Sequence, residues 1–85
     1  MSTQFESLID GMINAINGEV IDKSRVADRL LDLRNDAESP ALVEAVDELL
    51  RTIPGRSMVA TTWWREALDG LRIAAVIERE SSAAI

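Results

Sequence analysis

The sequence predicts an all-α protein, a small antiparallel bundle of four helices, and three observations support this fold class. Apolar residues recur at steps of three and four in four segments, the spacing of a helix with one buried face. Short polar, glycine or proline-containing connections separate most of these segments, and short connections favour antiparallel neighbours. With 85 residues, 47% of them hydrophobic, the chain can form one modest core. We expect a single domain over residues 1–80 and a frayed tail over 81–85.

The first two helices are predicted over residues 4–17 and 23–37. Thr3 and Glu6 have capping-box spacing, and Asn17-Gly18 is a stop signal because glycine tolerates a left-handed backbone. Asp22 is the expected N-cap of the second helix. The two apolar stripes comprise Phe5, Leu8, Ile9, Met12, Ile13 and Ile16, then Val26, Ala27, Leu30, Leu31, Leu33 and Ala37.

The third helix is predicted over residues 40–53 and the fourth over 62–79. Ser39 is a favourable N-cap, Pro40 fits the first helical position, and Pro54-Gly55 ends the third helix. Residues 56–62 are expected to form a loop or an early helical turn, with Thr61 or Thr62 as the cap. The β-branched residues in this segment leave one alternative open, a strand paired with residues 19–21. Gly70 inside the fourth helix indicates a close helix–helix approach or a partial break.

The only tryptophans of the chain, Trp63 and Trp64, are adjacent at the start of the fourth helix. Neighbouring helical residues point about 100° apart, so the two rings cannot both occupy the centre of one face. Two interpretations follow. The fourth helix is central in the bundle and both rings are in the core, or one ring is internal and the other contacts a partner or a second copy of the chain. Tryptophan and arginine are enriched at interface hot spots. The candidate partner-binding residues are Trp63, Trp64, Met58, Arg56, Arg65 and Leu68.

The residue inventory argues against several chemistries. The chain has no His, Cys or Tyr, so the usual general base, the soft metal ligands and the phenolic acid are missing. Lys23 is the only lysine, and neither a calcium-loop pattern nor a phosphate-binding glycine loop occurs. We therefore expect no enzyme activity, no cofactor, no metal and no small-molecule substrate. The third helix begins SPALVEAVDE, which lacks the basic and amide side chains of a DNA-recognition helix.

Charge and hydropathy suggest the kind of partner. The net charge is −6: residues 1–50 carry −7 (four basic and eleven acidic residues) and residues 51–85 carry +1. An acidic half of this kind disfavours nucleic acid. The apolar runs are too short to span a membrane, and MSTQFESLID lacks the basic start of a secretory signal, so a cytoplasmic location is expected. We expect a non-enzymatic interaction module that binds a protein partner, or itself as a homodimer, through the fourth helix. The alternative is an acidic inhibitor or antitoxin-like protein that neutralises a basic surface with acids of the first three helices.

Overall fold

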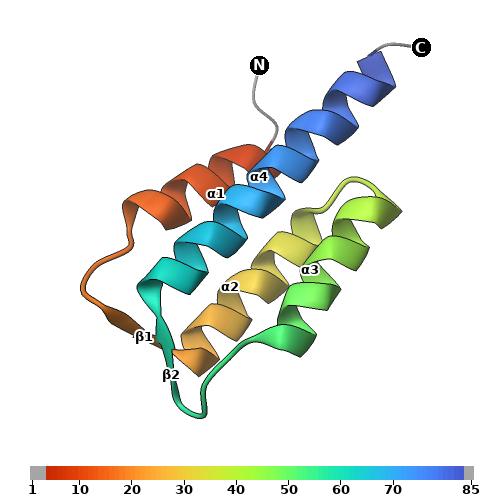
Figure 1. Cartoon of the computed structure of the whole chain (residues 1–85). Coiled ribbons are helices and arrows are strands. Elements are labelled where there is room, and N and C mark those ends of the chain that lie inside the picture. Colours follow the sequence, from red (N-terminus) through yellow and green to blue (C-terminus); the bar gives the residue numbers. More distant parts are fainter. Residues whose placement is uncertain (1–3, 84–85) are drawn as a thin grey trace.

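The computed structural model describes residues 4–83 as four α-helices and a two-stranded ribbon (Figure 1). The helices are α1 (Gln4–Asn14), α2 (Lys23–Asp36), α3 (Pro40–Thr52) and α4 (Thr61–Ala83). The strands are β1 (Val20–Asp22) and β2 (Met58–Ala60). The predicted all-α antiparallel bundle is confirmed, with the ribbon as an addition at one end.

The helices run alternately up and down around one core, so that each occupies a corner of the bundle (Figure 1). Helix α4 packs against α1 and α3, and α2 packs against the same two helices from the opposite corner. The interpretation in which the fourth helix is central is therefore wrong. Because α4 has helical neighbours on only two sides, one of its faces is left to solvent.

The core is built from the apolar stripes of all four helices and from one strand residue, Val59. Of the stripe predicted for the second helix, Leu31 is an exception, because its side chain is 48% exposed whereas that of its neighbour Leu30 is fully buried. The buried apolar side chains are Phe5, Ile9, Val26, Leu30, Leu33, Leu42, Val46, Val59, Trp64, Leu68, Leu71 and Ala75.

The start of α3 is as predicted. The backbone N–H of Leu42 donates to the Ser39 hydroxyl at 3.3 Å, and Pro40 is the first residue of the helix. This cap satisfies one of the backbone donors that the first turn of a helix leaves open. Asp22 precedes α2 as predicted, but its side chain makes no capping hydrogen bond.

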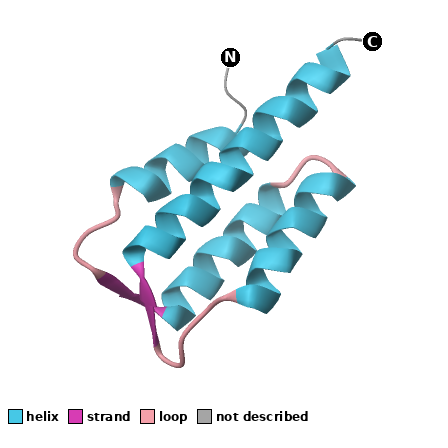
Figure 2. Cartoon of the chain, in the orientation of Figure 1, coloured by secondary structure: helices cyan, strands magenta, loops and turns pink. Residues whose placement is uncertain are grey.

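The ribbon confirms the alternative that the sequence left open, a strand pairing between the chain near residue 20 and the segment before the fourth helix (Figure 2). The strands are antiparallel, and Ile21 lies opposite Val59. Lys23, the first residue of α2, adds two hydrogen bonds to the segment before β2. Its backbone N–H donates to Ser57 O and its Nζ donates to Gly55 O, both at 2.9 Å. The segment expected to be a loop or helical turn is therefore a strand over 58–60.

The largest differences from the predicted boundaries lie in α1 and α4. Helix α1 ends at Asn14 rather than at 17, because the chain tightens into a turn in which Ile16 N–H donates to Ile13 O at 3.2 Å. Helix α4 begins at Thr61 and continues to Ala83, so the tail predicted to fray from residue 81 is helical through 83. Residues 84–85, and Thr3 of the predicted capping box, lie outside the described residues.

The hydroxyl of Thr61 has a different role from the predicted cap. It donates to the carbonyl of Gly18 at 2.8 Å, while the Thr61 N–H donates to Glu19 O at 2.9 Å. Both bonds join the first residue of α4 to the connection between α1 and β1. Gly18 itself has φ +75°, a left-handed conformation that glycine adopts without strain. The start of α4 is thus fixed by a segment more than 40 residues earlier in the chain.

Candidate interaction surface

The inner face of α4 belongs to the core and contains Trp64. The Trp64 side chain is 2% exposed and Leu68, one turn later, is fully buried. Leu71 and Ala75 continue the same face. Trp63 is half-buried and packs against the edge of the core with Ala67 and Ala74. The two tryptophans therefore differ as the second interpretation requires, with Trp64 internal and Trp63 partly accessible.

The outer face of α4 carries two isoleucines that are mostly exposed to solvent in the described part of the chain. Ile73 is 60% exposed and Ile77 is 58% exposed, the two highest values among the large apolar side chains of the described residues. At about 100° per residue, Ile73 points about 180° away from Trp64. Gly70, one turn before Ile73, is exposed, and a Cβ added there would meet no atom within 4 Å. The sequence suggested that Gly70 marks either a close helix–helix approach or a partial break. Neither is found within the described chain, because α4 is continuous through Gly70 and no described helix approaches it closely.

Acidic side chains surround these isoleucines. Glu66, Asp69 and Glu80 are exposed and make no ion pair with any described residue. With 100° per residue, all three point within about 40° of the Ile73 direction. We name the set Gly70, Ile73, Ile77, Glu66, Asp69 and Glu80 the α4 outer face.

The basic residues of α4 lie toward α1 instead. Arg72 Nε donates to Asp10 Oδ1 at 2.8 Å, and Arg79 Nη1 donates to Glu6 Oε2 at 2.8 Å. The Asp10 hydrogen bond raises the pKa of Arg72 further above its ordinary value, so this guanidinium stays charged. Glu6 is 2% exposed, so its pairing with Arg79 compensates part of the cost of burying a carboxylate. These pairs join α4 to α1. Arg72 also attracts Asp69 electrostatically, but no carboxylate of the α4 outer face forms a salt bridge with a described residue.

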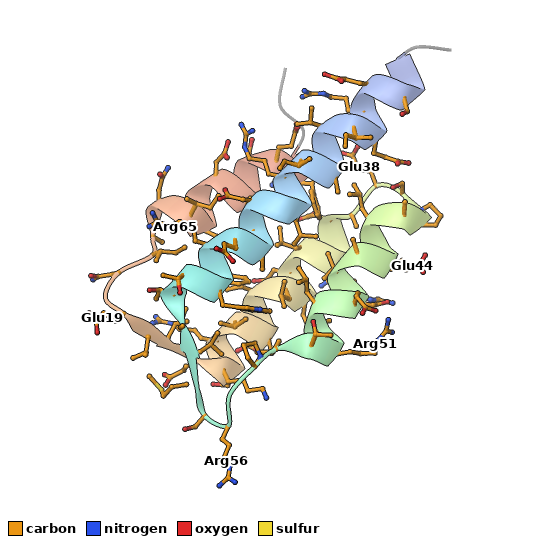
Figure 3. All side chains as sticks on the ribbon, viewed as in Figure 1. Glu19, Glu38, Glu44, Arg51, Arg56 and Arg65 are labelled. Atoms are coloured by element: carbon orange, nitrogen blue, oxygen red, sulfur yellow. The ribbon has the colours of Figure 1, made fainter. Side chains whose placement is uncertain are left out.

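The candidate partner-binding residues are dispersed in the structure. Trp64 and Leu68 were wrong as contact residues, because the helical period places both on the inner face of α4. Arg56, Met58 and Arg65 are exposed and Trp63 is half-buried. Figure 3 shows Arg51, Arg56 and Arg65, which are near one another in sequence, at three separate places around the bundle. The structure therefore does not unite the candidate residues into one surface.

Ile73 and Ile77 are the surface residues that sequence reasoning missed. Two lines of residues follow the fourth helix at steps of three and four: one contains Trp64, Ala67, Leu68, Leu71 and Ala75, and the other contains Trp63, Ala67, Gly70, Ala74 and Ile77. Ile77 ends the Trp63 line, whereas Ile73 falls on neither line. The available signal was the helical phase: once Trp64, Leu68, Leu71 and Ala75 define the core side, Ile73 must lie opposite. Periodicity alone could not choose between the Trp63 and Trp64 lines, because both include Ala67.

A second surface feature, with a mixed polar and apolar lining, lies at the ribbon end of the bundle. A hollow of about 270 Å³ is formed where α1 ends, the ribbon begins and α2 starts. Met58 and Val20, which are 43% and 53% exposed, form part of its wall, and Arg25 and Arg29 form another part. Its volume is at or below the lower end of the range of small-molecule sites, about 300 Å³. Met58 therefore belongs to a different surface from the α4 outer face.

The described residues contain no cluster of three or more His, Cys, Asp or Glu side chains arranged to hold a metal ion. Within residues 4–83, no helix combines the length and the apolar character needed to cross a membrane. No protein-family model matches the chain, and no match was found among curated proteins or among solved structures. The candidate site must accordingly be judged from its own geometry.

Proposed function

We propose that this chain is a non-enzymatic interaction module that binds another protein through the α4 outer face. The observation that supports the proposal is the exposure of Ile73 and Ile77, 60% and 58%, one turn apart on a helix whose opposite face is core. Single exposed apolar residues are ordinary on protein surfaces. Two at adjacent turns, beside an open Gly70, form the kind of apolar stripe that helical partners cover.

The absence of enzyme activity is part of the same proposal. Its support is the sequence, whose reactive side chains are limited to carboxylates, hydroxyls, arginines and Lys23. The Lys23 ammonium donates to the Gly55 carbonyl, a structural contact that holds the ribbon against α2. Side chains of this kind bind and orient, but they offer few routes to acid–base or nucleophilic chemistry at neutral pH.

The alternative, an acidic inhibitor acting through the first three helices, has less support. Several acids of these helices are already paired with arginine, which reduces the negative potential that they could offer to a basic surface. Arg34 Nε donates to Asp47 at 2.7 Å, and Arg29 approaches Asp32 at 3.8 Å. Arg51 pairs with Glu48 within α3. Asp28, Asp36 and Glu44 are exposed and form no salt bridge with a described residue, but no exposed apolar pair on one helical face accompanies them. The unpaired carboxylates of α4 lie on a different part of the molecule.

Site-specific photo-crosslinking tests the proposal. A photoreactive phenylalanine analogue replaces Ile73 in one version of the chain and Leu31 in another, and both are irradiated in the cells that produce them. Leu31 is the matched control, since it is an exposed apolar residue, 48% accessible, on the helix at the opposite corner. We expect a discrete adduct at position 73 that disappears with Ile77→Ser, and none at position 31.

Equal adducts at both positions, or none at position 73, would refute the proposal. An adduct with twice the mass of the chain would show that the bound protein is a second copy of the chain. The chain would then form a homodimer through this face instead of binding a different protein.

A further inference from the structure

We infer that the partner segment is a cationic amphipathic helix, a conclusion that rests on the proposed function and adds the chemistry of the partner. The α4 outer face combines an apolar centre with acidic surroundings. One row of α4, with i, i+3, i+7 spacing, consists of Gly70, Ile73 and Ile77. A row of side chains on a second helix can pack against such a surface. The backbone can approach closely at Gly70, where no atom lies within 4 Å of the position of a Cβ.

The charge around this row decides which helix fits. Glu66 and Glu80 lie seven residues before and after Ile73, on the same side of α4, and Asp69 lies one turn before it. None of these carboxylates forms a salt bridge with a described residue, and Arg72 and Arg79 pair with α1. Arg72 interacts with Asp69 only through the weaker charge attraction between them, so Glu66 and Glu80 are the carboxylates most available to a partner. Arg65 points about 80° away from Ile73, toward the α1 side. A partner with lysine or arginine one to two turns on either side of its apolar residues would meet a carboxylate at each end.

The same charges disfavour two other occupants. A second copy of this chain would add Glu66, Asp69 and Glu80 again and so bring two sets of unpaired carboxylates to one interface, in a protein of net charge −6. Like charges brought together cost free energy and suppress wrong partners. An acidic partner helix meets the same repulsion. Apolar contacts with Ile73 and Ile77 provide the affinity, and the carboxylates provide the selection for a basic partner.

The test uses two designed helical peptides of about 15 residues, a length at which a helix in water becomes stable enough to study. Both carry leucines at i and i+4. One has lysines on the flanking turns and the other has glutamates at the same positions. Each is labelled with a fluorophore and titrated with the whole chain at about 0.01 M and about 0.15 M ionic strength, where the Debye length falls from about 30 Å to about 8 Å.

We expect the lysine peptide to bind and to bind more weakly at the higher ionic strength, and the glutamate peptide not to bind at either. The triple variant Glu66→Gln, Asp69→Asn, Glu80→Gln should lose about tenfold in affinity for the lysine peptide, or about 1.4 kcal/mol. Ile73→Ser should lose at least as much, and Leu31→Ser should bind as the unaltered chain does. These exposed positions make no ion pair in the described chain, so the variants should fold, which circular dichroism checks.

The remaining outcomes separate the two proposals. Equal binding of both peptides, lost in Ile73→Ser, would overturn the cationic partner and leave the interaction surface standing. Binding of the lysine peptide that Ile73→Ser does not weaken would place its site elsewhere and overturn both. Failure of the lysine peptide to bind would overturn the cationic partner, while crosslinking at position 73 still decides the proposed function. A dimer in sedimentation that Ile73→Ser dissociates would identify a second copy as the occupant.

Discussion

Two adjacent leucines on α2 provide a sharp test of how the bundle is packed. Leu30 is fully buried, and Leu31 is 48% exposed. The substitution Leu30→Ala removes Cγ and both Cδ carbons from the core. At about 0.8 kcal/mol for each buried carbon, the lost transfer free energy is about 2.4 kcal/mol. The residual cavity adds about 24 cal/mol for each Å³ that the surroundings fail to fill, so the total should be about 3–4 kcal/mol.

The same substitution at position 31 is the control, because it exchanges the same two residue types in the same helix and so changes the intrinsic helix propensity by the same amount. Leu31→Ala should change the free energy of unfolding by less than about 1 kcal/mol, as surface substitutions do. Urea unfolding followed by circular dichroism measures both variants. A loss of about 3 kcal/mol should also lower the melting temperature by about 12–24 °C in a domain of this size.

The packing described for α2 would be refuted if Leu30→Ala cost less than about 1 kcal/mol, or if the two variants were equally destabilised. Either result would mean that the helix is rotated relative to the core.

Two further predictions use urea midpoints of single substitutions. Gly55 has φ +80° and an added Cβ would collide with Met58 O, so Gly55→Ala should destabilise the chain by more than about 1 kcal/mol. Gly70→Ala should instead stabilise it by about 0.5–1 kcal/mol, since that site is helical and open; a loss there would contradict the exposure of Gly70. Ser39→Ala removes the acceptor for Leu42 N–H and should cost about 1 kcal/mol, and an unchanged midpoint would show that this cap contributes nothing.

The sequence predicted those parts of the fold that depend on local signals. Ser39-Pro40 and Pro54-Gly55 set the limits of α3 to within one residue, because capping and helix breaking act over a few neighbouring positions. The β1–β2 pairing remained an open alternative. It joins residues about 40 positions apart, and a strand of three residues has no pattern of its own long enough to read.

Only part of the candidate site could be predicted from the sequence, because the rest depends on contacts between residues far apart in the chain. The sequence showed that the two tryptophans point in different directions on the fourth helix, but it left open whether both are in the core. Which line of residues faces the core depends on where α1 and α3 pack, and this is tertiary information. The Arg72–Asp10 and Arg79–Glu6 pairs turn one side of α4 toward α1 and so leave Ile73 outward.

The most direct test of the α4 outer face as a binding surface is a ¹H–¹⁵N NMR titration of the whole chain with the lysine peptide. Binding at this face should shift the amide signals of Gly70, Ile73 and Ile77 the most, with smaller changes along residues 66–80. The largest shifts at Val20, Met58 and Arg25, around the hollow at the ribbon end, would contradict the account, and a spectrum that the peptide leaves unchanged would overturn the cationic partner.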